Sequence, residues 1–65
     1  MDEEKFIKSV EELMAIQSKS ISNDDYMAGM YNGMVCVFNV LQDLLGKPQK
    51  EYCSYNKEEK KWELV

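Results

Sequence analysis

The chain has 65 residues and carries 12 acidic residues against eight basic ones, so its formal net charge is −4. All eight basic residues are lysine, whereas proteins that bind a nucleic-acid backbone normally show a basic stripe and arginine forks. The composition therefore argues against nucleic acid as a partner. It also predicts a single domain, because a chain of this size buries only about 60% of its unfolded surface.

Small domains of this kind usually gain stability from disulfides, a metal or oligomerisation. Cys36 and Cys53 allow at most one disulfide, and without histidine they do not form a zinc site. We therefore expect no metal and no cofactor, and we predict a homo-oligomer, a dimer or larger. No export signal and no apolar run long enough for a bilayer are visible, which predicts a cytoplasmic protein without membrane contact.

A first helix is predicted over residues 2–19. Asp2, Glu3 and Glu4 suit the positive N-terminal end of a helix dipole, and apolar residues recur at helical spacing on a single stripe. This stripe consists of Phe6, Ile7, Val10, Leu13, Met14 and Ile21. The other face is charged, so we expect this helix to bury one side only.

A second, longer helix is predicted over about residues 23–45. Ser22 and Asp25 have the spacing of a capping box in its acidic variant. Gly46 at the C-terminal end, followed by Pro48, is the expected stop signal.

The second helix presents apolar or small residues over an arc of about 220°. Its broad apolar face consists of Tyr26, Met27, Met30, Met34, Val37, Phe38, Leu41, Leu44 and Leu45. A strip of small residues beside it consists of Gly29, Gly33, Cys36 and Val40. The predicted solvent side comprises Asp24, Ala28, Asn32, Val35, Asn39, Gln42 and Asp43. Because the first helix can cover only part of this arc, a second copy of the chain or the C-terminal segment must cover the rest.

Residues 47–65 change in character. Two stretches rich in β-forming residues, 51–55 and 61–65, flank a charged stretch at 56–60, which is the pattern of a short β-hairpin. An isolated hairpin is marginal and would have to pack on the helices through Tyr52, Trp62 or Leu64, so a loose or partly helical tail is the alternative. The predicted fold is mainly α: an oligomeric helical hairpin with a long second helix and a C-terminal hairpin or tail.

Gly29 and Gly33 lie one turn apart inside the second helix, where each costs about 1 kcal/mol relative to alanine. Tight packing, within the subunit or at an oligomer seam, is the preferred interpretation, and a ligand pressed onto bare backbone is the alternative. Asn32 stands between the glycines and is predicted to have a role at this site. Asn39, two turns further on, is expected to be solvated.

The other candidate interface residues are methionines and aromatics. Met30, Met34 and Val37 fit a core or an oligomer interface, and methionine also makes adaptable binding surfaces. Aromatic side chains are numerous for so short a chain, and they are Tyr26, Tyr31, Tyr52, Tyr55 and Trp62. Such residues can stack on a nucleobase, but they are also the usual residues of a protein interface, which is the preferred interpretation.

Catalysis is not expected. The chain has no histidine, no arginine and no glycine-rich phosphate loop. Cys36 lies mid-helix on the strip of small residues and is predicted to pack rather than to act as a nucleophile. The paired acids Asp24 and Asp25 are accounted for by capping of the second helix.

Residues 26–34 read Tyr-Met-Ala-Gly-Met-Tyr-Asn-Gly-Met and precede an apolar stretch that ends at Leu45. This run resembles a pattern in small uncharacterised proteins of tailed bacteriophages, whose central helix carries a Tyr-x-x-Gly-x-x-Asn-Gly core. The resemblance covers about a third of the chain. It implies a phage origin and a cytoplasmic role in the infected cell, where such proteins act by binding a host enzyme or a signal nucleotide of bacterial immunity.

The first functional hypothesis is a non-enzymatic inhibitor that binds a host or antiviral-defence protein. It would present Tyr52, Tyr55 and Trp62 together with acidic residues. The net charge of −4 favours this hypothesis, because a chain without arginine has only lysines and backbone amides with which to hold phosphates.

A sponge that sequesters a nucleotide immune signal between subunits is the first alternative. It would use exposed backbone at Gly29 and Gly33, the amide of Asn32, and stacking by Tyr26 or Tyr31. A structural or assembly factor of the virion is the second alternative.

Overall fold

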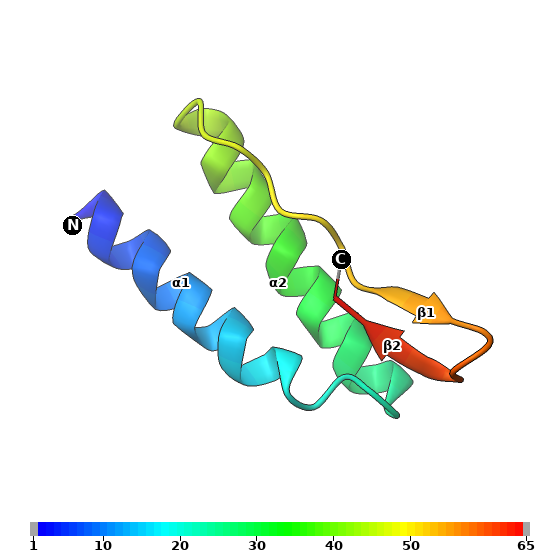
Figure 1. Ribbon diagram of the computed structural model, residues 1–65. Coiled ribbons are helices and arrows are strands. Elements are labelled where there is room, and N and C mark those ends of the chain that lie inside the picture. The colour runs from blue at the N-terminus through cyan, green and yellow to red at the C-terminus, as the bar shows by residue number, and fades with distance from the viewer. Residues whose placement is uncertain (1, 65) are drawn as a thin grey trace.

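The computed structural model describes residues 2–64 and contains two helices and a two-stranded antiparallel sheet. The elements are α1 (Glu3–Ser18), α2 (Asp25–Leu44), β1 (Ser54–Asn56) and β2 (Lys61–Glu63). Figure 1 shows α1 and α2 side by side as a hairpin, with the following segment running back along α2 towards the β-strands. The predicted helical hairpin is confirmed, and the C-terminal segment forms the β-hairpin rather than a tail. The last residue of the predicted stretch 61–65, Val65, lies outside the described residues.

The N-terminal end of each helix is capped by an aspartate. Asp2 Oδ1 accepts hydrogen bonds from the backbone N–H groups of Glu4 and Lys5, at 3.0 and 3.4 Å. Asp24 Oδ1 accepts from the two corresponding N–H groups of α2, at 3.0 and 3.2 Å. The predicted capping box at Ser22 is therefore wrong. Aspartate caps as well as serine does, and the Ser22 carbonyl instead accepts a 2.8 Å bond from Trp62 N.

The stop signal at the end of α2 is confirmed. Gly46 has φ +68°, a left-handed conformation that glycine adopts without steric cost. The N–H groups of Gly46 and Lys47 donate to the carbonyls of Asp43 and Gln42, at 3.1 and 2.8 Å. This is the Schellman motif, which satisfies the last carbonyls of a helix. It turns the chain back so that residues 47–53, which we name the strap, run along α2.

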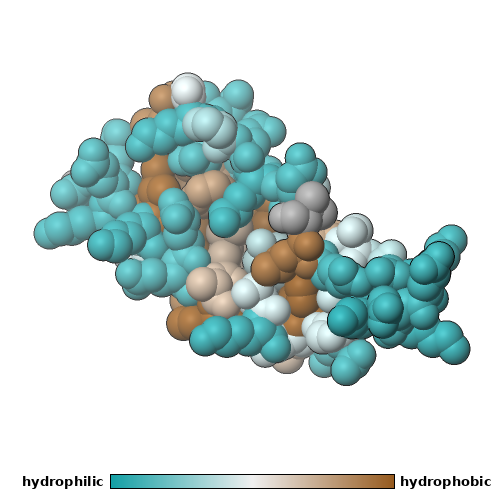
Figure 2. Space-filling model, viewed as in Figure 1, coloured by the Kyte–Doolittle hydropathy of each residue, from teal (hydrophilic) through white to brown (hydrophobic). Residues whose placement is uncertain are grey.

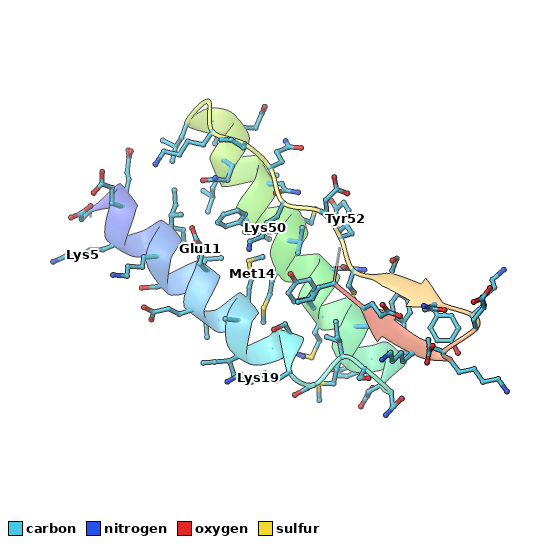
Figure 3. The ribbon with its side chains drawn as sticks, in the orientation of Figure 1. Lys5, Glu11, Met14, Lys19, Lys50 and Tyr52 are labelled. Atoms are coloured by element: carbon cyan, nitrogen blue, oxygen red, sulfur yellow. The ribbon has the colours of Figure 1, made fainter. Side chains whose placement is uncertain are left out.

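The core is a single layer between α1, α2 and the C-terminal segment. Met14 is almost fully buried, and Figure 3 shows its side chain directed from α1 towards α2. The buried apolar residues are Ile7, Met14, Ile21, Ala28, Tyr31, Val35, Phe38 and Cys53. So small a core goes with an elongated shape of 41 × 19 × 14 Å.

The predicted solvent side of α2 is wrong. Four of its members are buried, namely Ala28, Val35, Asn39 and Gln42. The reason is that the strap and the β-hairpin cover this side, while α1 covers the neighbouring one (Figure 1). The side left uncovered is the one that carries the glycines. Neither helix, within residues 2–64, combines the length and the apolar character needed to cross a membrane.

Candidate binding surfaces

Three side-chain amides of α2 hold the strap. The Asn39 Nδ2 group donates to Lys50 O at 2.9 Å, and Asn39 Oδ1 accepts from Lys50 N at 2.8 Å. Asn32 makes the same pair of bonds with Cys53, at 3.3 and 2.8 Å, and Gln42 Nε2 donates to Pro48 O at 2.9 Å. An amide carries both a donor and an acceptor, so each asparagine pairs with one residue of the strap as a neighbouring strand would.

These bonds change the roles expected for both asparagines. Asn39 is buried rather than solvated, because its amide is the partner of the strap backbone. Asn32 has a role, but it is to fix Cys53, and both of its polar groups are used for this. The Cys53 thiol is buried over α2, with Sγ 3.7 Å from Ala28 O. Burial raises the pKa of this thiol and also that of the Tyr31 hydroxyl.

The β-hairpin is attached to the start of α2 through Trp62. The indole Nε1 donates to Asp25 Oδ1 at 2.7 Å, and the Trp62 backbone N–H reaches Ser22 O. Across the strands Tyr55 pairs with Trp62, and their rings meet edge to face with centroids 5.5 Å apart. Asn56 organises the turn, since its Oδ1 accepts from Glu58 N and Glu59 N, both at 3.0 Å.

The hairpin and strap display the aromatic surface, which we define as Tyr52, Tyr55 and Trp62. Tyr52 lies on the strap just before β1 (Figure 3), and it is 48% exposed. Tyr55 is 46% exposed, while Trp62 is partly buried beneath it. Figure 2 shows hydrophilic residues over the adjacent hairpin turn, so the aromatic surface has a charged edge.

A second exposed surface lies on α2, on the side that neither α1 nor the strap covers. We name it the open face, and it consists of Tyr26, Gly29, Met30, Gly33, Cys36, Val37, Val40 and Leu44. Large apolar side chains project from it, with Leu44 77% and Val37 58% exposed. A Cβ atom added at Gly29 or Gly33 would meet nothing within 4 Å. Packing of the glycines within the subunit is therefore wrong, and Cys36 is exposed rather than packed.

Shallow apolar hollows extend the open face towards α1. One, of about 390 Å³, is lined by Val10, Leu13, Met30, Gly33, Met34 and Val37. Another, of about 350 Å³, lies near the start of α1 and the end of α2 and includes Phe6, Leu41 and Leu44. Among residues 2–64, no lysine lines either hollow. The open face and the exposed flank of α1 thus form one broad apolar side.

Of the residues named for a nucleotide site, Tyr31 and Asn32 do not lie on the open face. Tyr31 is only 5% exposed and belongs to the core, so its ring is not available for stacking. Asn32 faces the strap, whereas Gly29 and Gly33 lie on the open face with Tyr26, which is 73% exposed. Met34 is partly buried at the α1 groove.

Comparison with protein-family models, with curated proteins and with solved structures found no match to this chain. The assignment of function therefore depends on the two surfaces described above. Sequence reasoning missed three residues that shape them: Asn39 and Gln42, which hold the strap, and Asp25, which anchors Trp62. A signal for the first two exists in their spacing with Asn32, because residues 32, 39 and 42 share one side of a helix.

Proposed function

We propose that this chain is a non-enzymatic protein-binding module that inhibits its target by occupying it through the aromatic surface. The observation that carries the proposal is the display of Tyr52 and Tyr55 on a segment held in place from end to end. Tyrosine and tryptophan are enriched where binding energy concentrates in protein interfaces. The resemblance to small tailed-phage proteins suggests a target in the infected cell, either a host protein or a component of antiviral defence.

The attachment of the C-terminal segment supports this use. Within residues 2–64 no strand pairs with the strap, yet five side-chain-to-backbone hydrogen bonds fix it on α2. Tyr55 is further held against Trp62, which is itself bonded to Asp25. Side chains that are already ordered lose less conformational entropy on binding, and this raises affinity without new contacts.

Charge favours a protein over a nucleotide as the ligand. The chain has a net charge of −4, and in the described part of the chain no basic residue lines the apolar hollows of the open face. A phosphate there would have no cation to stabilise it, and in the hollow beside the N-terminus of α1 it would meet the acidic side chain of Glu3. The aromatic surface has no such requirement, because tyrosine offers an apolar ring and a polar tip to a protein partner.

Quantitative affinity capture tests the proposal, with the chain as bait and an extract of the cells that naturally produce it as the source of the target. The wild type is compared with a Tyr52→Ala/Tyr55→Ala variant and with a Lys8→Ala/Glu12→Ala control. The control removes two exposed side chains of α1 and leaves the net charge unchanged. We expect one protein to be recovered in stoichiometric amount with the wild type and the control. Its recovery with the tyrosine variant should fall at least about 30-fold, as loss of one hot spot of 2 kcal/mol implies.

Two outcomes would contradict this function. In the first, the captured protein binds the tyrosine variant as well as the wild type, while circular dichroism shows both variants folded. In the second, denaturing the purified chain releases a stoichiometric nucleotide, detected by mass spectrometry. That result would support sequestration of a nucleotide in place of inhibition of a protein.

A further inference from the structure

The two halves of the open face differ in shape, because one half is recessed and the other projects. The N-terminal half contains Gly29 and Gly33, where the backbone is bare and an added Cβ atom would have no neighbour within 4 Å. The C-terminal half contains Val37, Val40 and Leu44, each more than half exposed. The helix thus presents holes at one end of its open face and knobs at the other.

Such a face is complementary to itself when two copies run antiparallel. A two-fold axis passing α2 at about residue 35 sets Gly33 opposite Val37. It also sets the backbone around Gly29 opposite Val40, and Tyr26 opposite Leu44 at each end. A parallel pair would instead set the projecting side chains of Val37, Val40 and Leu44 against the same residues of the partner, so that the helices could approach at the glycines only by separating at the other end. Antiparallel pairing also aligns the two helix dipoles favourably.

The area available on α2 and α1 together is of the order that a dimer interface buries. The 20 residues of α2 form a rod about 30 Å long, and half of its lateral surface is roughly 500 Å². The exposed flank of α1 adds Phe6 and Leu13 on the same side, across the hollows already described. A standard interface buries about 800 Å² on each partner, and the two helices together approach this value.

We propose that the open face is covered by the open face of a second copy, with the two α2 helices antiparallel across a two-fold axis. An isologous dimer requires a self-complementary surface, and the arrangement of holes and knobs supplies it. The eight residues of the open face carry no charged side chain, and Glu3 and Asp43 lie only at its edges, so the centre of the contact is uncharged even though each chain has a net charge of −4. This assembly goes beyond the proposed target binding. It involves neither Tyr55 nor Trp62, whereas Tyr52 lies at the edge of the open face, in a hollow that it shares with Cys36, Val40 and Leu44.

The mass of the purified chain in solution tests association. Light scattering after size-exclusion chromatography should give twice the monomer mass of 7.6 kDa. Gly33→Leu fills a hole of the open face and should weaken self-association at least tenfold. The control Lys8→Leu adds the same side chain on the outer side of α1 and should leave the dimer unchanged. A wild-type monomer at high concentration would overturn the proposal, as would a dimer that Gly33→Leu leaves intact.

Disulfide trapping tests the orientation. In a Cys36→Ser background, Tyr26→Cys and Leu44→Cys are prepared as separate variants, since residues 26 and 44 lie about 27 Å apart along the helix. Antiparallel pairing predicts that mixing the two variants under oxidising conditions gives a disulfide-linked heterodimer, while neither variant alone is linked. Linkage of each variant with itself would show a parallel dimer and overturn the proposed orientation. Because both measurements use the purified chain alone, their outcome is independent of the target-binding test.

Discussion

Replacing Asn39 with alanine should loosen the strap at its midpoint. The substitution removes both hydrogen bonds to Lys50, of 2.8 and 2.9 Å, from a side chain that is buried on α2. In the described part of the chain, α2 is the element that forms hydrogen bonds with these backbone groups of the strap. The cost of the substitution therefore measures how much the amide contacts contribute to the fold.

The expected loss of stability is about 1.5 kcal/mol. Each of the two hydrogen bonds contributes about 1 kcal/mol net, and no further penalty is added because Lys50 is exposed and its backbone can bond to water when the amide is removed. Alanine recovers about 0.5 kcal/mol through its higher helix propensity. A chain of 65 residues has a total stability of about 3–10 kcal/mol. The melting temperature should therefore fall by roughly 6–12 °C.

Urea unfolding at one fixed protein concentration measures this loss, followed by Trp62 fluorescence and by helical circular dichroism. Fixed concentration matters because self-association would shift the apparent stability by mass action. The matched control is Asn23→Ala, which removes the same side chain from an exposed loop position and should change stability by less than about 0.5 kcal/mol. Equal effects of the two substitutions would refute the account of the strap.

Three further predictions concern the glycines and the thiols. Gly33→Ala should stabilise the dilute monomer by about 1 kcal/mol in urea unfolding, because the added methyl meets open space and favours the helix. The same variant should self-associate more weakly by light scattering; a stronger dimer would contradict the close approach of backbones. In dilute native protein one thiol per chain, Cys36, should react with a thiol reagent at pH 8, and Cys53 should react only after unfolding; rapid reaction of both would be inconsistent with the buried Cys53. Burial raises the folded-state pKa of Cys53 above its ordinary value of 9.0, so the folded chain keeps a proton that the unfolded chain loses, and stability should fall as pH rises above about 9. Cys53→Ala should make stability fall less steeply with pH in this range. An unchanged dependence of stability on pH would refute the attribution of the fall to Cys53.

The helices and their ends are encoded locally, which is why sequence reasoning places them within two residues. Gly46 and Pro48 act through backbone geometry that depends on few neighbours. The start of α2 is harder to place, because Ser22, Asp24 and Asp25 all suit a cap. The structure uses Asp24 for the cap, while the Asp25 carboxylate accepts the indole N–H of Trp62 and the backbone carbonyl of Ser22 accepts the Trp62 N–H.

The buried face of α2 differs from the prediction because polar side chains on one side of a helix do not by themselves show that this side is exposed to solvent. Asn39 and Gln42 are polar, yet their amides pair with the strap backbone, a contact between residues that no periodicity reveals. Ala28 and Val35 lie on the same side, and their apolar character is a sign that it is covered. The first part of the strap, residues 47–50, has no strand pattern, and the β-forming stretch 51–55 pairs with a strand only from Ser54 on. The path of the strap therefore follows from these tertiary contacts and not from local propensity.

For the candidate binding residues too, some features can be predicted from the sequence and others depend on tertiary contacts. Tyr52 and Tyr55 belong to a segment whose position depends on tertiary contacts, and both remain about half exposed. Gly29 and Gly33 stand out in the sequence by their cost inside a helix, while the direction they face depends on where α1 and the strap lie. Tyr31, one residue from Asn32, belongs to the core because it points towards α1 and not towards the open face.

The strap covers one side of α2, and a second copy is proposed to cover another. Solvent accessibility of individual amides, measured by NMR with a soluble paramagnetic probe at low and at high protein concentration, tests both contacts in one experiment. We predict that the amides of Gly29, Gly33 and Val37 lose accessibility as concentration rises, and that the amides of Lys50 and Cys53, which are bonded to α2, stay protected throughout. Glycine amides whose accessibility does not change with concentration, or Lys50 and Cys53 amides that are accessible in the dilute protein, would contradict these contacts.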